Sequence, residues 1–256
     1  MPETSGSFTF WEHVYRYAFA CRFAAGNRIL DVACGEGYGA AALRKAGAAQ
    51  VVGVDVSERV CVHARRKYGL DARAGSAENL PLADSSVELV VSFETIEHVA
   101  NPARFLDECA RVLVPRGTLI VSTPNKDVYS RPGAPVNQYH CSEMSEGEFV
   151  SALRARFRKI CLYTQRPYSA GWWSLRISAS EVGPRWRLLS RLRRSAQFRF
   201  FPKAVYDPTN EQRTSIVGEI LTASRGRTSP LNPYAILKRK KWTLERPYYF
   251  IATATH

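Results

Sequence analysis

Short apolar runs and longer segments of helical spacing alternate along the first 120 residues of the chain. The apolar runs, rich in β-branched residues, are predicted strands at residues 29–32, 51–55, 71–75, 87–93 and 117–122. Helices are predicted directly after the first glycine-rich segment, at residues 57–68 and at residues 102–113. Strands that alternate with helices are typical of a parallel sheet with helices on both faces. The pattern therefore predicts a doubly wound α/β fold.

Further elements are predicted on both sides of this segment. Residues 8–24 place apolar side chains at helical spacing and predict an amphipathic helix that covers the sheet or a pocket. Ser145 precedes a predicted helix over residues 145–156, with a glutamate three residues later, as in a capping box. Two more strands are predicted at residues 160–164 and 248–254.

The segment between these last two strands is long, and it is rich in arginine, proline and aromatic residues. We expect it to be an insertion, because 256 residues suit one domain with an elaboration better than two domains. The predicted organisation is a helical cap at 1–26, a core at 27–165, a basic aromatic insertion or lid at 166–242 and a final core strand at 243–256.

Charge is the unusual feature of the composition. The chain has 36 Lys and Arg against 23 Asp and Glu, which gives a net charge of +13 and a pI near 9.7. Residues 185–241 alone carry 14 Lys and Arg against three acidic residues, so the rest of the chain has a net charge of only +2. This distribution indicates either a local anion-binding surface or a solvated basic lid, and not a chain that is basic throughout.

The sequence contains no signal for a membrane or for an oxidising compartment. Its apolar runs are far shorter than the ~20 residues that a membrane helix needs, and its N-terminus does not resemble a secretory signal. The six cysteines form no CxxC pair and have no zinc-finger spacing. We therefore expect a cytoplasmic protein with no membrane span and no disulfides.

A glycine-rich segment at residues 31–39, Asp-Val-Ala-Cys-Gly-Glu-Gly-Tyr-Gly, lies between the first predicted strand and a helix. Glycines there let the backbone approach a ligand, and the start of the helix offers free N–H groups to an anionic group. Asp55 ends the second predicted strand, where its carboxylate can accept hydrogen bonds from both hydroxyls of a ribose. Asp31 suits a cationic group instead. Together these residues predict a ligand that contains a nucleoside.

This segment resembles the class I S-adenosylmethionine-dependent methyltransferases, whose Asp-x-x-x-Gly-x-Gly pattern and acidic residue after strand two are both matched. The resemblance covers residues 8–165 and implies S-adenosylmethionine as the cofactor. It also implies a Rossmann-like sheet of seven strands, mostly parallel, with the last strand antiparallel. In relatives the stretch at residues 75–81 contacts the adenine, although Ser76 stands where many of them have Asp. The cofactor-binding residues that it implies are Asp31, Ala33, Gly35, Gly37, Asp55, Val56, Ser76, Ala77, Glu78 and Phe93.

A cluster of chemical groups follows the fourth predicted strand. Glu94, Glu97 and His98 stand at positions i, i+3 and i+4, so a helical turn would bring them onto one face, with His140 as a fourth ligand. Carboxylate and imidazole ligands of this kind suit Mg²⁺ or Mn²⁺. The Glu-x-x-Glu-His motif resembles metal-dependent O-methyltransferases, including small-RNA 3′-terminal 2′-O-methyltransferases and ubiquinone-biosynthesis enzymes. That resemblance implies catalytic roles for Glu97, His98 and His140.

Three interpretations of this cluster stay open. It can hold a metal ion that lowers the pKa of an acceptor hydroxyl. It can act without a metal, with His98 as the general base. It can also be structural, with Glu97 and His98 bonded to the cofactor loop or to the loop at Asn125.

Five segments together resemble bacterial methyltransferases that occur with glycosyltransferases in polysaccharide assembly; they are residues 15–20, 33–39, 92–98, 123–130 and 137–140. The resemblance implies O-methylation of a sugar, in an anionic, glycan, nucleotide-linked or natural-product acceptor. One alternative is RNA 2′-O-methylation aided by the basic insertion, and another is a non-catalytic S-adenosylmethionine-binding subunit that docks through it. Nucleic acid is the less favoured partner, because the sequence shows no RNA-binding module motif. The oligomeric state is not predicted.

Overall fold

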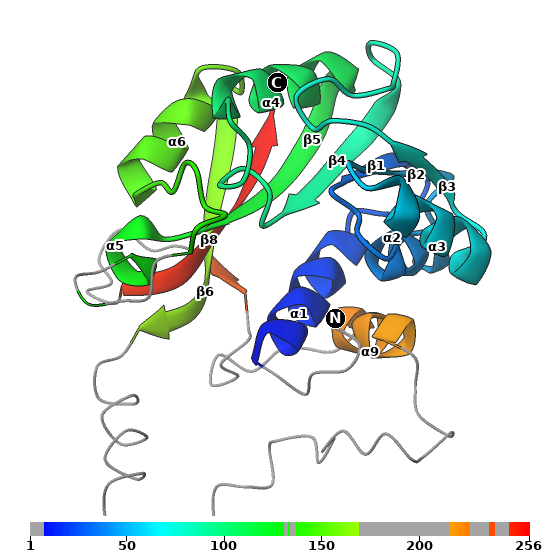
Figure 1. The fold of residues 1–256 in the computed structure, drawn as a ribbon, viewed down its shortest axis with the longest axis horizontal. Coiled ribbons are helices and arrows are strands. Elements are labelled where there is room, and N and C mark those ends of the chain that lie inside the picture. Colours follow the sequence, from blue (N-terminus) through cyan, green and yellow to red (C-terminus); the bar gives the residue numbers. More distant parts are fainter. Residues whose placement is uncertain (1–7, 131–132, 134–136, 169–215, 226–235, 239–245) are drawn as a thin grey trace, which may run out of the picture.

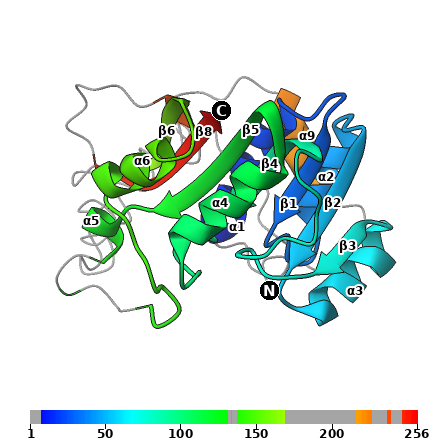
Figure 2. The ribbon, with the colours of Figure 1, turned by 90° about the horizontal axis from the view of Figure 1, so that it is seen from above.

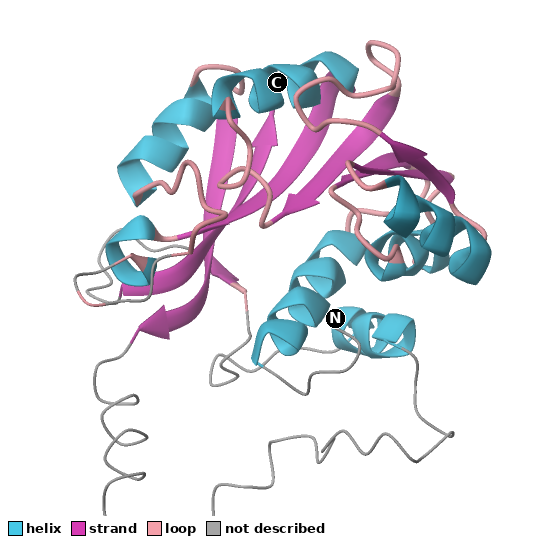
Figure 3. Cartoon of the chain, in the orientation of Figure 1, coloured by secondary structure: helices cyan, strands magenta, loops and turns pink. Residues whose placement is uncertain are grey.

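The computed structural model describes residues 8–130, 133, 137–168, 216–225, 236–238 and 246–256. One mixed sheet with helices on both faces forms this part of the chain (Figures 1 and 3). The strands are β1 (Arg28–Val32), β2 (Gln50–Asp55), β3 (Asp71–Ala74), β4 (Val87–Phe93), β5 (Leu113–Pro124), β6 (Lys159–Tyr168), β7 (Leu237–Lys238) and β8 (Arg246–Thr255). The helices are α1 (Phe8–Cys21), α2 (Tyr38–Lys45), α3 (Glu58–Tyr68), α4 (Pro102–Val112), α5 (Lys126–Tyr129), α6 (Glu146–Arg154) and α9 (Ile216–Arg225).

The strand order is β3-β2-β1-β4-β5-β8-β6-β7. The strands β3, β2, β1, β4 and β5 are parallel neighbours, and β8 lies antiparallel between β5 and β6. β6 therefore runs in the same direction as the first five strands. This confirms the predicted sheet of seven strands, mostly parallel with an antiparallel last strand. The two-residue strand β7, antiparallel to β6, adds an edge that the sequence pattern did not predict.

Alternating side chains of the strands bury two hydrophobic clusters, one on each face of the sheet. Ile29 of β1 belongs to the cluster beneath α1, α2, α3 and α9, whereas its neighbour Leu30 belongs to the cluster beneath α4 and α6. The two helical layers lie on opposite sides of the sheet in Figure 1. Ser145 forms the predicted capping box at the start of α6, with Glu148 as its partner.

Helix α9 lies in the segment predicted to be an insertion, yet it is part of the core. Val217 and Ile220 are 2% and 0% exposed and belong to the same cluster as α1 and α2. Figure 2 shows α9 beside α2 on one side of the sheet. The sequence pattern predicts irregular structure here, whereas the structure has a helix. Most of the basic residues predicted to form the lid lie outside the described residues, so the division at 166–242 stays a prediction.

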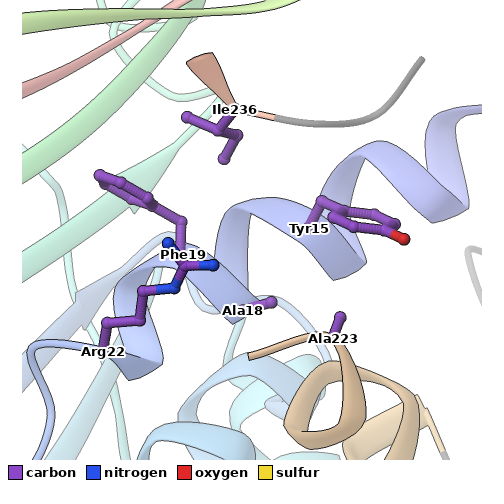
Figure 4. Close-up of a pocket in the computed structure, with 6 residues that line it drawn as sticks. All are labelled: Tyr15, Ala18, Phe19, Arg22, Ala223 and Ile236. Carbon is purple, nitrogen blue, oxygen red and sulfur yellow. The ribbon is translucent and has the colours of Figure 1, made fainter. Parts of the chain in front are cut away.

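Helix α1 packs against the sheet and also against α9, so it is more buried than an amphipathic surface helix. Tyr15 and Phe19 of α1, and Arg22 just after it, lie opposite Ala223 of α9 and Ile236, as Figure 4 shows. The space between them is only about 10 Å³. It is too small for a nucleoside, so α1 and α9 form a packed layer there and not a ligand site.

The parallel strands bring the candidate residues to one edge of the sheet. Asp31 pairs in register with Gly53 of β2 and with Val91 of β4. The carboxyl ends of these three strands, which carry Asp55 and Phe93, therefore lie together, where open α/β sheets bind their ligands. No helix among the described residues is long and apolar enough to cross a membrane.

Candidate active site

The loop between β1 and α2 has a backbone that few side chains tolerate. Gly35 and Gly37 have φ values of 53° and 87°, and Ala33 between them and the strand has 57°. A Cβ at Gly37 would also lie 2.7 Å from the Cβ of Ala64 in α3. The two glycines are therefore required for the turn that presents the first N–H groups of α2 at the sheet edge.

Asp55 ties this loop to the end of β2. Its carboxylate accepts hydrogen bonds from the N–H of Gly35 at 3.0 Å and from the N–H of Ser57 at 2.9 Å. A carboxylate has about four lone-pair positions, so two remain for further donors such as ribose hydroxyls. The next side chain, Val56, is 83% exposed and offers an apolar surface to a base at this edge.

Asp31 is completely buried at the end of β1. The hydroxyl of Tyr17, from α1, lies 3.2 Å from both of its carboxylate oxygens. The pKa of Asp31 is raised to about 7, mainly by burial and with a contribution from the charge of Asp55, whereas the Tyr17 hydrogen bond opposes the rise. The predicted site for a cationic group is thus a carboxyl that titrates near neutral pH.

Tyr17 is a site residue that the sequence analysis missed. Its ring packs edge-on against Phe93 and Tyr38, at centroid distances of 5.1 and 5.6 Å. It fits because residue 39 is glycine; a Cβ there would lie 2.0 Å from the ring. No periodicity could reveal this contact, because it joins α1 to the first turn of α2, and only the fold brings the two helices together.

The stretch after β3 lies beside Asp55, because the N–H of Gly75 donates to the Asp55 carbonyl at 2.9 Å. Its side chains are used locally. The hydroxyl of Ser76 accepts from the N–H of Glu78 at 3.1 Å, and the Glu78 carboxylate accepts from the N–H of Asn101. The roles of Ser76, Ala77 and Glu78 toward an adenine stay predictions.

The segment after β4 does not form the predicted helical turn, so Glu94, Glu97 and His98 do not share one face. Glu94 has a φ of 52°, and a tight turn closes only after it, from the N–H of His98 to the carbonyl of Thr95. The Glu94 carboxylate instead accepts from the Ser122 hydroxyl at 2.7 Å and lies 3.3 Å from Nη1 of Arg16. Glu94 thus lies outside the cluster of candidate ligand atoms in this structure, and the four-residue ligand set stays a prediction.

The other three members of the set do come together. The candidate ligand atoms of Glu97, His98 and His140 lie within 4.8 Å of one another. Nε2 of His98 is 4.0 Å from Oε1 of Glu97, and the two imidazole rings meet edge to face at 4.8 Å. We call these three residues the Glu-His-His trio.

Hydrogen bonds to Nδ1 orient both imidazoles. Nδ1 of His98 donates to the carbonyl of Tyr139 at 2.8 Å, and Nδ1 of His140 donates to the Glu143 carboxylate at 2.6 Å. Because a neutral imidazole carries one N–H, each Nε2 is left with its lone pair. This is the arrangement in which metal-binding histidines are usually held.

Glu97 is the buried member of the trio, with 0% exposure. Its Oε2 accepts from the Thr123 hydroxyl at 3.2 Å, whereas its Oε1 has no hydrogen-bond partner among the described residues. Burial raises the pKa of Glu97 well above its ordinary value, and the Glu94 charge adds to the rise. A buried acceptor without a partner is costly, so Oε1 fits a proton, a hydroxyl or a metal ion.

An open groove of about 270 Å³ lies beside the trio, lined by His140 together with Lys126, Ser130, Asn137 and Glu143. Tyr139 is 68% exposed, although its carbonyl is bonded to His98. Arg16 is the second residue that the sequence analysis missed. It is completely buried beside Glu94, at the end of β4 next to the trio.

Residues 30–121 match the family described as "Methyltransferase domain". A "Probable S-adenosylmethionine-dependent methyltransferase" of Mycolicibacterium smegmatis is 39% identical over 150 residues, which cover 57% of this chain and 58% of the relative. A ubiquinone biosynthesis O-methyltransferase of Parvibaculum lavamentivorans is 38% identical over 104 residues, covering 39% of this chain and 41% of the relative. The chain thus spans little more than half of the first relative's length.

Solved structures share the fold across almost the whole chain. A SAM-dependent methyltransferase of Thermotoga maritima superposes with a TM-score of 0.57 at 19% identity, over 97% of this chain and 94% of its own. The [4+2]-cyclase SpnF gives 0.55 at 19% identity, over 96% and 80%. These structures show the fold of the chain, and residues 30–121 are similar to a methyltransferase domain.

Proposed function

We propose that this chain transfers a methyl group from S-adenosylmethionine to a hydroxyl oxygen of a sugar-containing acceptor. The observation that carries the proposal is the Glu-His-His trio, in which a buried carboxylate oxygen with no hydrogen-bond partner among the described residues lies near two oriented imidazoles. Glu97 and His98 of the trio lie in the segment after β4, next to the edge that carries Asp31 and Asp55, and His140 comes from the loop before α6. An acceptor hydroxyl held at the trio would therefore lie close to a cofactor bound along that edge.

The cofactor half of the site has one group for each part of S-adenosylmethionine. Asp31 is a buried carboxyl suited to the amino group, and the loop at Gly35 and Gly37 lets the backbone approach the cofactor. Asp55 keeps lone pairs for the ribose, and the exposed side chain of Val56 supplies an apolar surface for the adenine.

Methyl transfer is an in-line displacement on a sulfonium, so the protein must align the acceptor oxygen and remove its proton. Glu97 suits the second task, because burial has raised its pKa and Oε1 is ready to accept a proton. The same three side chains would hold a divalent metal ion. Such an ion, when bound, would lower the pKa of the acceptor hydroxyl. His98 and His140 would be ligands through Nε2 in that case.

One argument supports transfer to oxygen, and a second supports a sugar as the acceptor. Transfer to oxygen is supported by two relatives named ubiquinone biosynthesis O-methyltransferases, which are 38% and 35% identical to this chain over the aligned residues. The groove beside the trio is lined by amide, hydroxyl, ammonium, carboxylate, imidazole and thiol groups, and its many polar groups suit the hydroxyls of a sugar. The five segments that resemble polysaccharide-associated enzymes agree with this acceptor.

Calorimetry with S-adenosylhomocysteine tests the cofactor half. We expect binding in the micromolar range that Asp55→Ala weakens sharply, because the variant loses both the ribose acceptor and the anchor of the loop. Asp71→Ala is the matched control, since Asp71 is an exposed aspartate at the other end of the neighbouring strand, paired with Arg73. Equal affinity in wild type and Asp55→Ala would remove the cofactor assignment.

Transfer of a labelled methyl group tests the acceptor half. We expect label in sugar nucleotides or glycan oligosaccharides, loss of turnover after dialysis against EDTA, and recovery on adding a divalent metal. Full turnover in chelator would leave Glu97 or His98 as a metal-free base. Label in short RNA alone would favour the 2′-O-methyltransferase alternative, and label in no acceptor would favour a non-catalytic subunit.

A further inference from the structure

We propose that Arg16 keeps Glu94 out of the metal site, so that the Glu-His-His trio alone binds the ion and selects a transition metal over Mg²⁺. This inference rests on the proposed function, because it names the class of ion that the same site takes. It changes the expectation from the sequence, where two carboxylates and two imidazoles suggested Mg²⁺ or Mn²⁺.

The position of Arg16 is fixed from several sides. The side chain is completely buried, and its Nε donates to Oε1 of Gln165 in β6 at 2.8 Å. Its guanidinium carbon lies 4.2 Å from the centre of the Tyr249 ring in β8. Gln165 in turn donates to the carbonyl of Glu12 at 3.1 Å. Two strands and the helix α1 therefore hold the cation at one place.

Glu94 is held next to this cation by its own backbone and by β5. The N–H of Glu94 donates to the Ser122 hydroxyl at 3.1 Å, and that hydroxyl donates back to Oε1 of Glu94 at 2.7 Å. The same Oε1 lies 3.3 Å from Nη1 of Arg16. Breaking a buried ion pair leaves two uncompensated charges, so Glu94 stays with Arg16 unless that residue is removed.

The trio is left with one carboxylate and two imidazoles. Mg²⁺ prefers oxygen ligands in octahedral geometry, whereas imidazole suits Fe²⁺, Co²⁺ and Zn²⁺. Glu97 is then the anionic ligand of the trio, and its Oε1, which has no hydrogen-bond partner in the described part of the chain, is the atom that this ion would contact. Arg16 thus acts on the site without touching the ion: it is a positioning residue for Glu94.

Metal titrations of the full-length protein after chelator treatment test the proposal. Co²⁺ is followed by its visible absorption and Mg²⁺ by calorimetry. We expect Co²⁺ to bind and Mg²⁺ to bind at least about a hundredfold more weakly, in line with the preference of imidazole ligands. Glu94→Gln should change the Co²⁺ affinity by less than threefold, while Glu97→Gln weakens it by tenfold or more.

Arg16→Met provides the second arm. With the cation gone, Glu94 can turn to the trio, and we expect Mg²⁺ affinity to rise by about tenfold, or 1.4 kcal/mol. If Arg16→Met does not fold, the comparison of Glu94→Gln with Glu97→Gln decides alone. Equal losses in those two variants, Mg²⁺ binding as tight as Co²⁺, or no Co²⁺ binding at all would each overturn the proposal.

S-adenosylhomocysteine binding separates these failures from failure of the proposed function. A protein that binds S-adenosylhomocysteine and methylates a hydroxyl but binds no Co²⁺ contradicts only the metal inference. A protein that binds Co²⁺ through the trio but neither binds S-adenosylhomocysteine nor transfers a methyl group contradicts the proposed function.

Discussion

The hydroxyl of Tyr17 in α1 lies 3.2 Å from each carboxylate oxygen of Asp31 in β1, where neither group contacts solvent freely. This contact closes the cofactor end of the site from the side of the N-terminal helix. It also places a titratable carboxyl and its donor at the position proposed for the amino group of the cofactor.

The first prediction concerns pH. Because the pKa of Asp31 is about 7, the carboxylate that binds an ammonium group is lost as the pH falls below 7. We expect the affinity for S-adenosylhomocysteine to drop by up to about tenfold per pH unit below that value. Calorimetry between pH 5.5 and 8.5 measures the drop, and Asp31→Asn should bind weakly at every pH, without the pH dependence.

The same raised pKa makes the free energy of unfolding fall as the pH rises, whereas it makes cofactor affinity increase. The unfolded chain releases the Asp31 proton near pH 3.8, whereas the folded protein keeps it until about pH 7. The stability associated with this carboxyl is therefore complete below pH 3.8 and is lost as the pH rises through 7. Urea unfolding should show Asp31→Asn gaining stability relative to wild type between pH 5 and pH 8; a gain toward acid would contradict the assignment.

The second prediction concerns the Tyr17 hydroxyl. Its hydrogen bond opposes the rise in the Asp31 pKa, so Tyr17→Phe should raise that pKa further. The midpoint of the pH dependence of S-adenosylhomocysteine binding is then expected to move to higher pH. Tyr139→Phe is the control, because it removes the hydroxyl of an exposed tyrosine distant from Asp31. An unchanged midpoint in Tyr17→Phe would show that the hydroxyl does not act on Asp31.

The third prediction concerns close packing at Gly39. A Cβ at this position would lie 2.0 Å from the Tyr17 ring, so Gly39→Ala should destabilise the fold by about 1–3 kcal/mol. Gly147→Ala in α6 is the matched control, because no atom lies within 4 Å of its added Cβ. That variant should gain about 0.5–1 kcal/mol, as alanine does over glycine inside helices. Denaturant unfolding measures both, and equal effects would refute the packing argument.

The fourth prediction concerns the partner of His140. The Glu143 carboxylate accepts from Nδ1 of His140 at 2.6 Å and so fixes which ring nitrogen faces the trio. Glu143→Gln should weaken Co²⁺ binding by roughly 10- to 100-fold, the usual effect of losing such a partner. Asp107→Asn is the control, since that exposed carboxylate pairs with Arg156. Co²⁺ affinity equal to wild type would show that Glu143 has no part in the site.

Much of the fold was predictable because strong local signals specify it. The β-branched runs, the glycine turn after β1 and the capping box at Ser145 each act over a few residues, and each appears where expected. Helix α9 was not predicted, although Ile216, Val217, Ile220 and Leu221 have helical spacing. The segment around it is rich in arginine and proline, so a single short apolar stripe did not indicate a core helix. The stripe is buried because it packs against α1.

The candidate site was predictable in composition and only partly in geometry. Glu97, His98 and His140 meet, even though about 40 residues separate the first two from the third. Glu94 does not join them, although the sequence spacing suggested that it would, because that expectation assumed a helix. Its backbone instead adopts a left-handed conformation, and its carboxylate is bonded to Ser122. Arg16 and Tyr17 were missed because their contacts are with strands and loops distant in sequence.

Arg16 and Tyr17 are consecutive residues of α1, yet one contacts the carboxylate of Glu94 and the other that of Asp31. A ligand that shifts α1 at Asp31 would therefore also move the cation that holds Glu94 beside the trio. By thermodynamic reciprocity, any factor by which the cofactor changes metal affinity is the factor by which the metal changes cofactor affinity. A single turn of helix would thus couple the two proposed binding equilibria.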